Sequence, residues 1–88
     1  MHSVLLIDDD ERFRKSVRAF LQKEFGFLCA EFADVDDAVQ KVPYLKPDLV
    51  ILEVPMGIEA TYQLRKMLPR TPIILFTMHE SCRSSRLA

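Results

Sequence analysis

The chain has 88 residues, a length that suits one small domain. Hydrophobic residues make up 49% of it and charged residues 28%, which excludes a disordered chain and indicates a globular domain. Twelve basic residues oppose thirteen acidic ones, and a net charge of −1 argues against non-specific attraction to nucleic acid or anionic lipid. The sequence has no apolar run of the ~18 residues that a transmembrane helix needs. We therefore expect one domain over residues 1–88, with neither nucleic acid nor membrane among its partners.

The first apolar run and the two cysteines indicate in which cellular compartment the protein lies. Residues 4–7 are apolar but end in acids, which does not fit the ~7–15-residue apolar core of a secretory signal. Cys29 and Cys82 are isolated thiols without CxxC or metal-ligand spacing. One disulfide between them is conceivable, but we expect reduced thiols and a cytoplasmic location.

Four apolar runs are typical of β-strands. Residues 4–7 and 49–52 are unbroken runs rich in strand formers, as in strands that are buried on both faces. Residues 27–32 and 72–77 predict the second and the fourth strand in chain order. The first run stops at four consecutive acids, and the third stops at Glu53.

Amphipathic patterns between these runs predict three helices. The first helix has four apolar residues at helical spacing and four basic residues on the opposite face. The apolar set is Phe13, Val17, Phe20 and Leu21, and the basic set is Arg12, Arg14, Lys15 and Arg18. Gly26 stops this helix. The second helix begins after the N-cap Asp34 and ends at Pro43, and the third follows Gly57 and ends at Pro69.

Strands that alternate with helices in this way predict a small doubly wound α/β domain. Its sheet is parallel and covered by helices on both faces, with right-handed crossovers between the strands. Residues 3–78 form the core of the domain, and residues 79–88, rich in serine, form a tail.

Polar side chains gather where three of the strands end. In such folds ligands bind outside the carboxyl ends of the strands, and these ends carry Asp8, Asp9 and Asp10 on the first strand, Glu53 on the third and Thr77 on the fourth. Carboxylate oxygens suit Mg²⁺, and a hydroxyl can bond a phosphoryl oxygen. The alternative for the acids after the first strand is a solvated turn and helix N-cap, where acids are favoured in any protein.

Four motifs of this sequence resemble the receiver domains of bacterial response regulators. They are LLIDDD at residues 5–10, PDLVILE at 47–53, GIEA at 57–60 and ILFTMHES at 74–81, and the last is most similar to the NarL/FixJ branch. The resemblance covers residues 3–81 and implies the flavodoxin-like fold with strand order 2-1-3-4-5. It also implies a phosphorelay in which a histidine kinase or phosphotransfer protein donates a phosphoryl group to an aspartate at the end of the third strand.

The resemblance assigns roles to particular residues. Asp9 would contact Mg²⁺ directly and Asp8 through water, while the backbone carbonyl of Pro55 would complete the metal shell. Thr77 matches the hydroxyl residue that senses the phosphoryl group. A receiver of this kind is a signalling module and not an enzyme.

Three departures from the family predict a degenerate receiver. Glu53 stands where the family has its phosphoaccepting aspartate, and the connection over residues 54–57 is about four residues short. No lysine follows Lys66 in these 88 residues, and we expect a receiver without the fifth βα unit and its phosphate-binding lysine. We expect an atypical signalling and interaction module. In the family such a change from aspartate to glutamate sometimes imitates the charged, activated state, but the absence of the lysine and of the output face argues against a complete switch. The alternatives are Mg²⁺-dependent phosphoryl acceptance on Glu53 or on a neighbour such as Asp10, and a structural remnant held together by dimerisation.

The missing βα unit also predicts self-association. Without it the fourth strand is an unprotected sheet edge, and exposed apolar edges favour pairing. We expect a homodimer through this edge, unless the segment 78–88 folds back over it.

Overall fold

The four apolar runs form the strands of one parallel sheet. The computed structural model describes residues 2–76 and contains β1 (Ser3–Ile7), β2 (Leu28–Phe32), β3 (Leu49–Glu53) and β4 (Ile73–Phe76), in the spatial order β2-β1-β3-β4. The predicted alternation of strands and helices and the flavodoxin-like strand order are thereby confirmed. Within the part of the chain described, no helix is long and apolar enough to cross a membrane.

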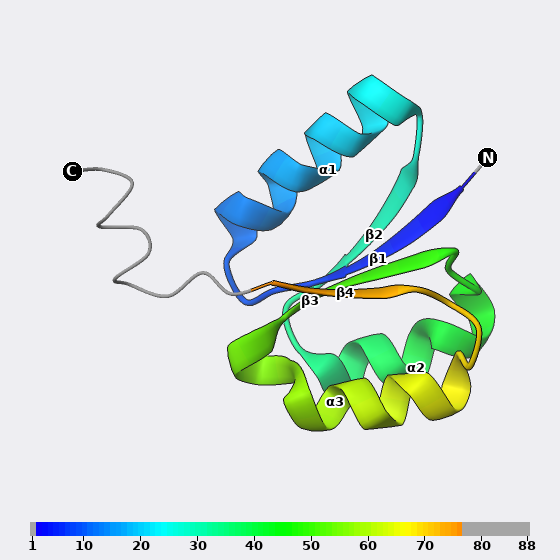
Figure 1. Cartoon of the computed structure of the whole chain (residues 1–88). Coiled ribbons are helices and arrows are strands. Elements are labelled where there is room, and N and C mark those ends of the chain that lie inside the picture. Colours follow the sequence, from blue (N-terminus) through cyan, green and yellow to red (C-terminus); the bar gives the residue numbers. More distant parts are fainter. Residues whose placement is uncertain (1, 77–88) are drawn as a thin grey trace.

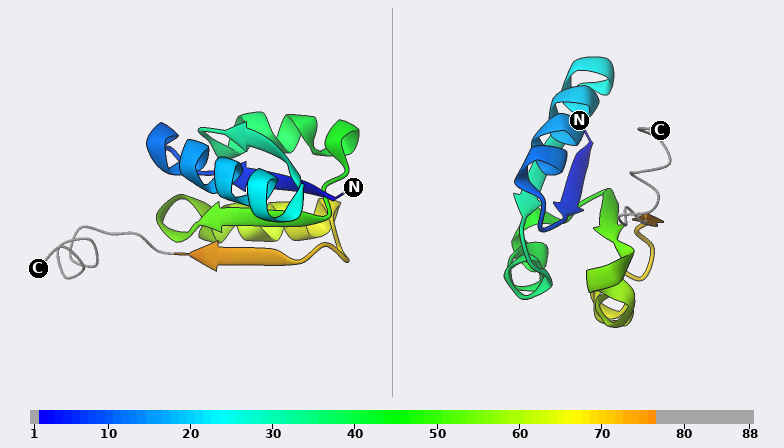
Figure 2. Two further views of the ribbon diagram at one scale, coloured as in Figure 1. Left: turned by 90° about the horizontal axis from the view of Figure 1, so that it is seen from above. Right: turned by 90° about the vertical axis from the view of Figure 1, so that its left-hand side faces the viewer.

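Three helices cover the two faces of this sheet unequally. Helix α1 (Glu11–Phe25) lies alone on one face, and α2 (Val35–Leu45) and α3 (Val54–Met67) lie side by side on the other (Figure 1). The two turned views in Figure 2 show the same layers from above and from the end of the strands. The architecture therefore has three layers, with the sheet in the middle.

The apolar core lies between the sheet and the pair α2 and α3. Alternate residues of each strand point to one face, and here the strands contribute Leu5, Ile7, Val50 and Leu52. The helices contribute Ala38, Val42, Ala60 and Leu64. All eight side chains are buried, so this face of the sheet supplies most of the hydrophobic stabilisation among the described residues.

The first helix ends as predicted and the second does not. Gly26 closes α1 in the left-handed region at φ 69°, and its N–H donates to the Gln22 carbonyl. The prediction that Pro43 ends the second helix was wrong, because α2 continues to Leu45 with Pro43 inside its last turn. Pro43 lacks an N–H to donate, yet the turn closes because the Lys46 N–H donates to the Val42 carbonyl at 3.0 Å.

The third helix begins earlier than predicted. It starts at Val54, directly after the last residue of β3, and not after Gly57. Proline is favoured in the first helical turn because its fixed φ suits the helix and its missing N–H has no partner there. Pro55 occupies that turn, so the short connection is absorbed into the helix.

Strand β4 forms an open edge of the described sheet. It pairs only with β3 among the described strands, and its side chains Ile74 and Leu75 are 50% and 45% exposed. The expectations on Thr77, on Cys82 and on the tail fall on residues 77–88, which lie outside the described residues.

Candidate metal centre at the carboxyl ends of β1 and β3

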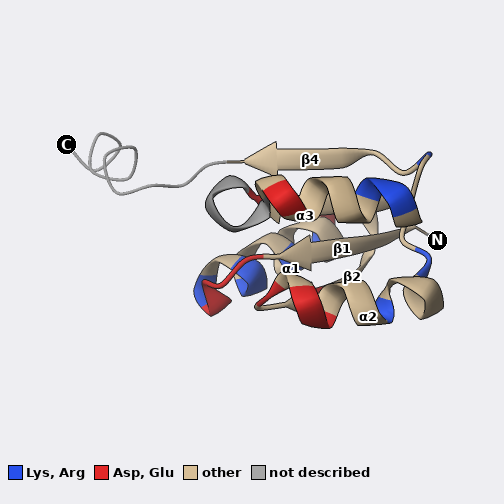
Figure 3. Ribbon diagram, turned by 90° about the horizontal axis from the view of Figure 1, so that it is seen from below, with Lys and Arg blue, Asp and Glu red and all other residues tan. Residues whose placement is uncertain are grey.

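Strands β1 and β3 are parallel neighbours, so their carboxyl ends meet at one edge of the sheet. Each of Asp8, Asp9 and Glu53 offers a carboxylate oxygen, and these three oxygens lie within 4.8 Å of one another. Figure 3 shows the acidic stretch that follows β1 at this end of the strand. Three of the acids that the sequence singled out therefore do converge.

Asp8 is held firmly and keeps one oxygen unsatisfied. Its side chain is fully buried. Its backbone N–H donates to the Phe32 carbonyl of β2 at 3.1 Å, and its Oδ1 accepts the Asp10 N–H at 2.9 Å. Its Oδ2 has no hydrogen-bond partner within the described chain. A buried carboxylate oxygen without a partner destabilises a fold unless something binds it.

The pKa of Asp8 reflects this environment. Burial raises the pKa of the carboxyl above its ordinary value, because a desolvated carboxylate loses its hydration. The hydrogen bond from the Asp10 N–H opposes this rise, and the neighbouring carboxyls of Asp9 and Asp10 add to it. A cation would relieve both causes of the rise, so the donor set fits a hard divalent ion.

Glu53 reaches the same cluster from β3. It is the last residue of the strand, lies opposite Phe76 in the register with β4, and is only 7% exposed. It also occupies the N-cap position of α3, but its side chain makes no capping hydrogen bond there. The carboxylate is therefore turned to the cluster and not to the helix terminus.

Asp10 has a different function from the three clustered acids. Its Oδ1 accepts the N–H groups of Arg12 and Phe13, at 3.0 and 3.3 Å, and so caps α1. For this residue the N-cap interpretation is right, and Asp10 is not one of the three acids whose ligand atoms converge.

Two residues that support this edge were not indicated by the sequence pattern. Arg14, which the pattern placed on the outer face of α1, is largely buried, and its Nη1 donates to the Asp8 carbonyl at 2.6 Å. Its Nε lies 3.4 Å from Oε1 of Glu31 on β2. Two signals were present: Arg14 shares a helix face with Leu21, seven residues on, and Glu31 is a lone acid in an otherwise apolar strand.

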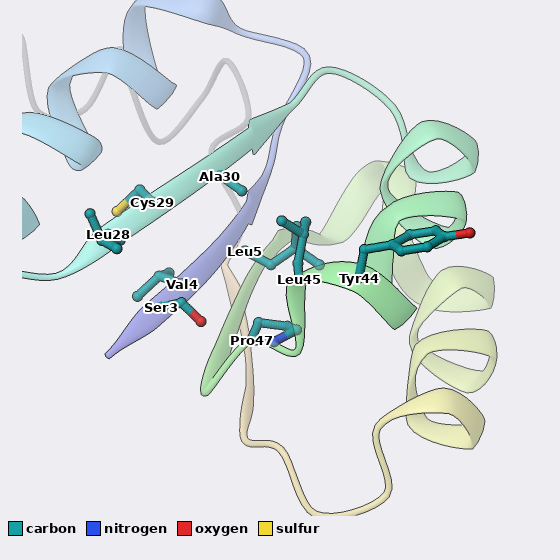
Figure 4. A pocket seen from close by; sticks show the side chains of 9 residues that line it. All are labelled: Ser3, Val4, Leu5, Leu28, Cys29, Ala30, Tyr44, Leu45 and Pro47. Carbon is teal, nitrogen blue, oxygen red and sulfur yellow. The ribbon is translucent and has the colours of Figure 1, made fainter. Parts of the chain in front are cut away.

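The opposite end of the sheet holds an apolar pocket of about 270 Å³. It lies between the start of β1 and β2 and the end of α2, and Figure 4 shows side chains such as Leu28, Leu45 and Tyr44 around it. Its one thiol, Cys29, is free, and burial raises the pKa of that thiol. A protonated thiol is a poor nucleophile, so the acidic edge is the better candidate for chemistry.

Comparison with known proteins decides the family. The family model for the response regulator receiver domain matches residues 4–86 of this chain. The chain belongs to the response regulator receiver domain family. The receiver resemblance inferred from its motifs is thus confirmed, and the chain is a receiver domain of a two-component response regulator.

Individual relatives agree with this assignment. The response regulator protein VraR of Staphylococcus saprophyticus is 32% identical over 81 residues, which cover 86% of this chain and 39% of VraR. The chemotaxis protein CheY4 of Vibrio cholerae matches with a TM-score of 0.81 at 27% identity, over 98% of this chain and 76% of that structure. The chain therefore spans about two fifths of the curated relative, whose other parts have no counterpart among these residues.

A third match is a solved complex. The structure of histidine kinase ThkA with response regulator protein TrrA contains a chain that matches this receiver with a TM-score of 0.78 at 28% identity. The match covers 91% of this chain and 72% of that one.

Proposed function

We propose that this receiver binds Mg²⁺ through Asp8, Asp9 and Glu53 but does not run the standard phosphorylation cycle, and acts as a signalling and interaction module. The observation that carries the proposal is the convergence of the three carboxylates within 4.8 Å, with a glutamate as the member from β3. Metal binding follows from the cluster, and the altered cycle follows from the glutamate.

The donor set accounts for the choice of cation. Mg²⁺ is bound through one or two carboxylates, keeps several waters and leaves room for phosphate oxygens. In this receiver the exposed Asp9 is suited to direct contact and the buried Asp8 to contact through water, as the family resemblance implies. When bound, the ion would neutralise phosphoryl oxygens at the site. The chain's own contribution is to fix the positions of the carboxylates.

Glu53 is a poor phosphoryl acceptor for two physical reasons. Its additional methylene shifts the carboxylate by about 1.5 Å relative to an aspartate, and a misplacement of about 1 Å can cost ~100-fold in rate. Its side chain is also largely buried, which limits the access of a phosphodonor. A permanent carboxylate at this position instead imitates the charge of an activated receiver.

Two further assignments rest on the resemblance. The carbonyl of Pro55 is proposed as a metal ligand, although Pro55 lies in the first turn of α3 and helical carbonyls point along the axis toward the C-terminus. Thr77 is proposed as the hydroxyl that senses the phosphoryl group, at the position after Phe76 of β4.

The partners follow from the family and from the open sheet edge. A histidine kinase or a phosphotransfer protein in the cytoplasm is the proposed donor, since a matched structure pairs a kinase with its regulator. A homodimer is proposed through β4, whose outer backbone edge has no partner strand in the described sheet and whose Ile74 and Leu75 are half exposed.

Intact mass spectrometry tests the proposed function. The receiver is incubated with Mg²⁺ and a small acyl phosphate beside the variant Glu53→Asp, which moves the carboxylate to the family's position. We expect no phosphoryl adduct on the unmodified chain and an adduct on Glu53→Asp. An adduct on the unmodified chain, mapped to Glu53 or Asp10, would show a working acceptor and overturn the degenerate assignment.

A parallel titration separates metal binding from phosphorylation. Mg²⁺ binding is followed by calorimetry for the unmodified chain and for Asp9→Asn, and we expect binding that the variant weakens at least tenfold. If neither protein binds Mg²⁺ and neither Glu53 form accepts a phosphoryl group, the alternative of a structural remnant is favoured.

Light scattering after size-exclusion chromatography tests the homodimer. The variant Ile74→Lys places a charge on the exposed edge and is expected to elute as a monomer. Tyr44→Lys, an exposed residue of α2 away from β4, is expected to leave the dimer intact. A monomer for the unmodified chain at high concentration contradicts the proposal.

A further inference from the structure

Arg14 is the residue that joins α1 to the end of β1. It lies in the second turn of α1, and its backbone N–H donates to the Asp10 carbonyl at 3.0 Å in the first bond of the helix. Its side chain turns back, so that Nη1 donates to the carbonyl of Asp8 at 2.6 Å. One residue therefore spans the whole Asp8–Asp10 turn with both its backbone and its side chain.

Glu31 holds Arg14 in this position. Its Oε1 lies 3.4 Å from Nε of Arg14, and these two side chains are only 15% and 13% exposed. Its Oε2 pairs with Nη1 of Arg18 at 3.0 Å, and that arginine is 50% exposed. Nε of Arg14 makes no hydrogen bond within the described chain, so Glu31 acts on Arg14 as a nearby opposite charge, and this attraction keeps the guanidinium beside Asp8.

The main chain of Asp8 is thereby fixed from two elements. Its N–H is bound to Phe32 of β2 and its C=O to Arg14 of α1, while its carboxylate Oδ1 is bound by the Asp10 N–H. These bonds hold Oδ2 buried and unpaired beside Asp9 and Glu53, against the repulsion between the carboxylates. We propose that Arg14, held by Glu31, is a positioning residue that keeps Asp8 and Asp9 in the arrangement that receives a divalent cation. This inference rests on the proposed Mg²⁺ binding.

Two variants separate this role from a general effect of charge. Arg14→Met keeps an unbranched apolar stem but removes the guanidinium and its bond to Asp8. Arg18→Met removes one positive charge and one contact with the same Glu31. The bond to the Asp8 carbonyl comes from Arg14, so this variant leaves it in place. Substitution of a residue that orients a metal ligand typically lowers the metal affinity by about 10–100-fold. We therefore expect calorimetry to show a loss of Mg²⁺ affinity of about tenfold or more for Arg14→Met and less than about twofold for Arg18→Met.

A second readout needs no metal. Amide hydrogen exchange of the metal-free protein is measured at Asp8 and Asp10, with the buried Leu52 as a reference for global stability. We expect exchange at Asp8 and Asp10, relative to Leu52, to be about tenfold faster in Arg14→Met than in Arg18→Met, because only the first variant releases the turn. Equal exchange in the two variants overturns the positioning role, as does equal loss of affinity.

The two readouts also separate this inference from the proposed function. If the unmodified chain does not bind Mg²⁺, the proposed function fails, and exchange at Asp8 and Asp10 still decides whether Arg14 fixes the turn. If Arg14→Met does not fold, Arg14→Lys replaces it. A lysine keeps the charge but loses the planar guanidinium fork that contacts both Asp8 and Glu31, so the same changes are expected at a smaller size. An unchanged affinity and exchange in Arg14→Lys overturns the role of the fork.

Discussion

The two faces of the sheet are held by different forces. Toward α2 and α3, the strands and helices bury one continuous apolar cluster. Toward α1, no helical residue is fully buried, and the contacts include the ion pairs of Glu31 with Arg14 and Arg18 and the stack of Phe13 on Phe76 at 5.0 Å. The first face has most of the fully buried apolar side chains. The second face buries Val4 and Leu6 of β1 and carries the polar contacts that hold Asp8.

Truncation of one leucine on each face should show the largest effect. Leu64→Ala on α3 removes a fully buried side chain of the cluster and is expected to cost about 3 kcal/mol of unfolding free energy. Leu21→Ala on α1 removes a half-buried side chain and should cost only about 1 kcal/mol, because less apolar area is lost. Urea unfolding followed by circular dichroism measures both. Equal losses would mean that the two faces contribute alike.

The sequence predicted the apolar face better than the polar one. Unbroken runs such as residues 49–52 have few other interpretations, because a continuous apolar segment between turns is stable only when buried. On the other face the pattern gave Phe20 as an inward residue, yet it is exposed. The pattern also predicted that Arg14 points to solvent, yet its side chain is largely buried. A contact across 17 residues, from Arg14 to Glu31, depends on the register of β2, which helical periodicity does not contain.

The candidate site was predictable in part for the same reason. Neighbouring parallel strands bring their ends together, so Asp8 and Glu53 could be expected to meet once the strands were found. The sequence could not tell that Asp8 is buried and Asp9 exposed, since both follow the same strand. It also could not show that α3 begins at Val54, because a proline in the first turn of a helix and a proline in a loop look alike.

Neutralising the buried acid should stabilise the metal-free protein. Asp8→Asn removes a desolvated charge and its repulsion with Asp9 and Glu53, while the amide oxygen can still accept the Asp10 N–H. We expect the unfolding free energy to rise by about 1–2 kcal/mol, the scale of an unsatisfied buried polar group, and Mg²⁺ binding to be lost. Asp9→Asn is the control, since Asp9 is exposed and should change stability little. A destabilised Asp8→Asn would show that its charge is compensated.

The pH dependence of the unfolding free energy should also show the cost of burying the Asp8 carboxylate. Burial raises the pKa of Asp8 in the folded protein above the ordinary value of 3.8 for this carboxyl. When the pH rises through 3.8 the unfolded chain loses this proton first, so stability falls, and the fall is complete once the pH exceeds the folded pKa. The difference in unfolding free energy between Asp8→Asn and the unmodified chain, measured in EDTA, should therefore grow from pH 3 upward and then level off. A difference that does not vary with pH contradicts the raised pKa.

The smallest effects are expected at the C-terminal caps of the helices on the two faces. Gly26 ends α1 at φ 69° with open space where a Cβ would lie, so Gly26→Ala should cost about 1 kcal/mol through the backbone alone. Lys46 ends α2 at φ 45° and already bears that strain. Lys46→Gly relieves about 1–2 kcal/mol of it but adds roughly 0.5–1 kcal/mol of unfolded-state freedom. The net gain is therefore about 0.5 kcal/mol. Thermal unfolding should show a lower stability for Gly26→Ala and a higher stability for Lys46→Gly. A lower stability of Lys46→Gly would mean that the lysine side chain itself stabilises the end of α2.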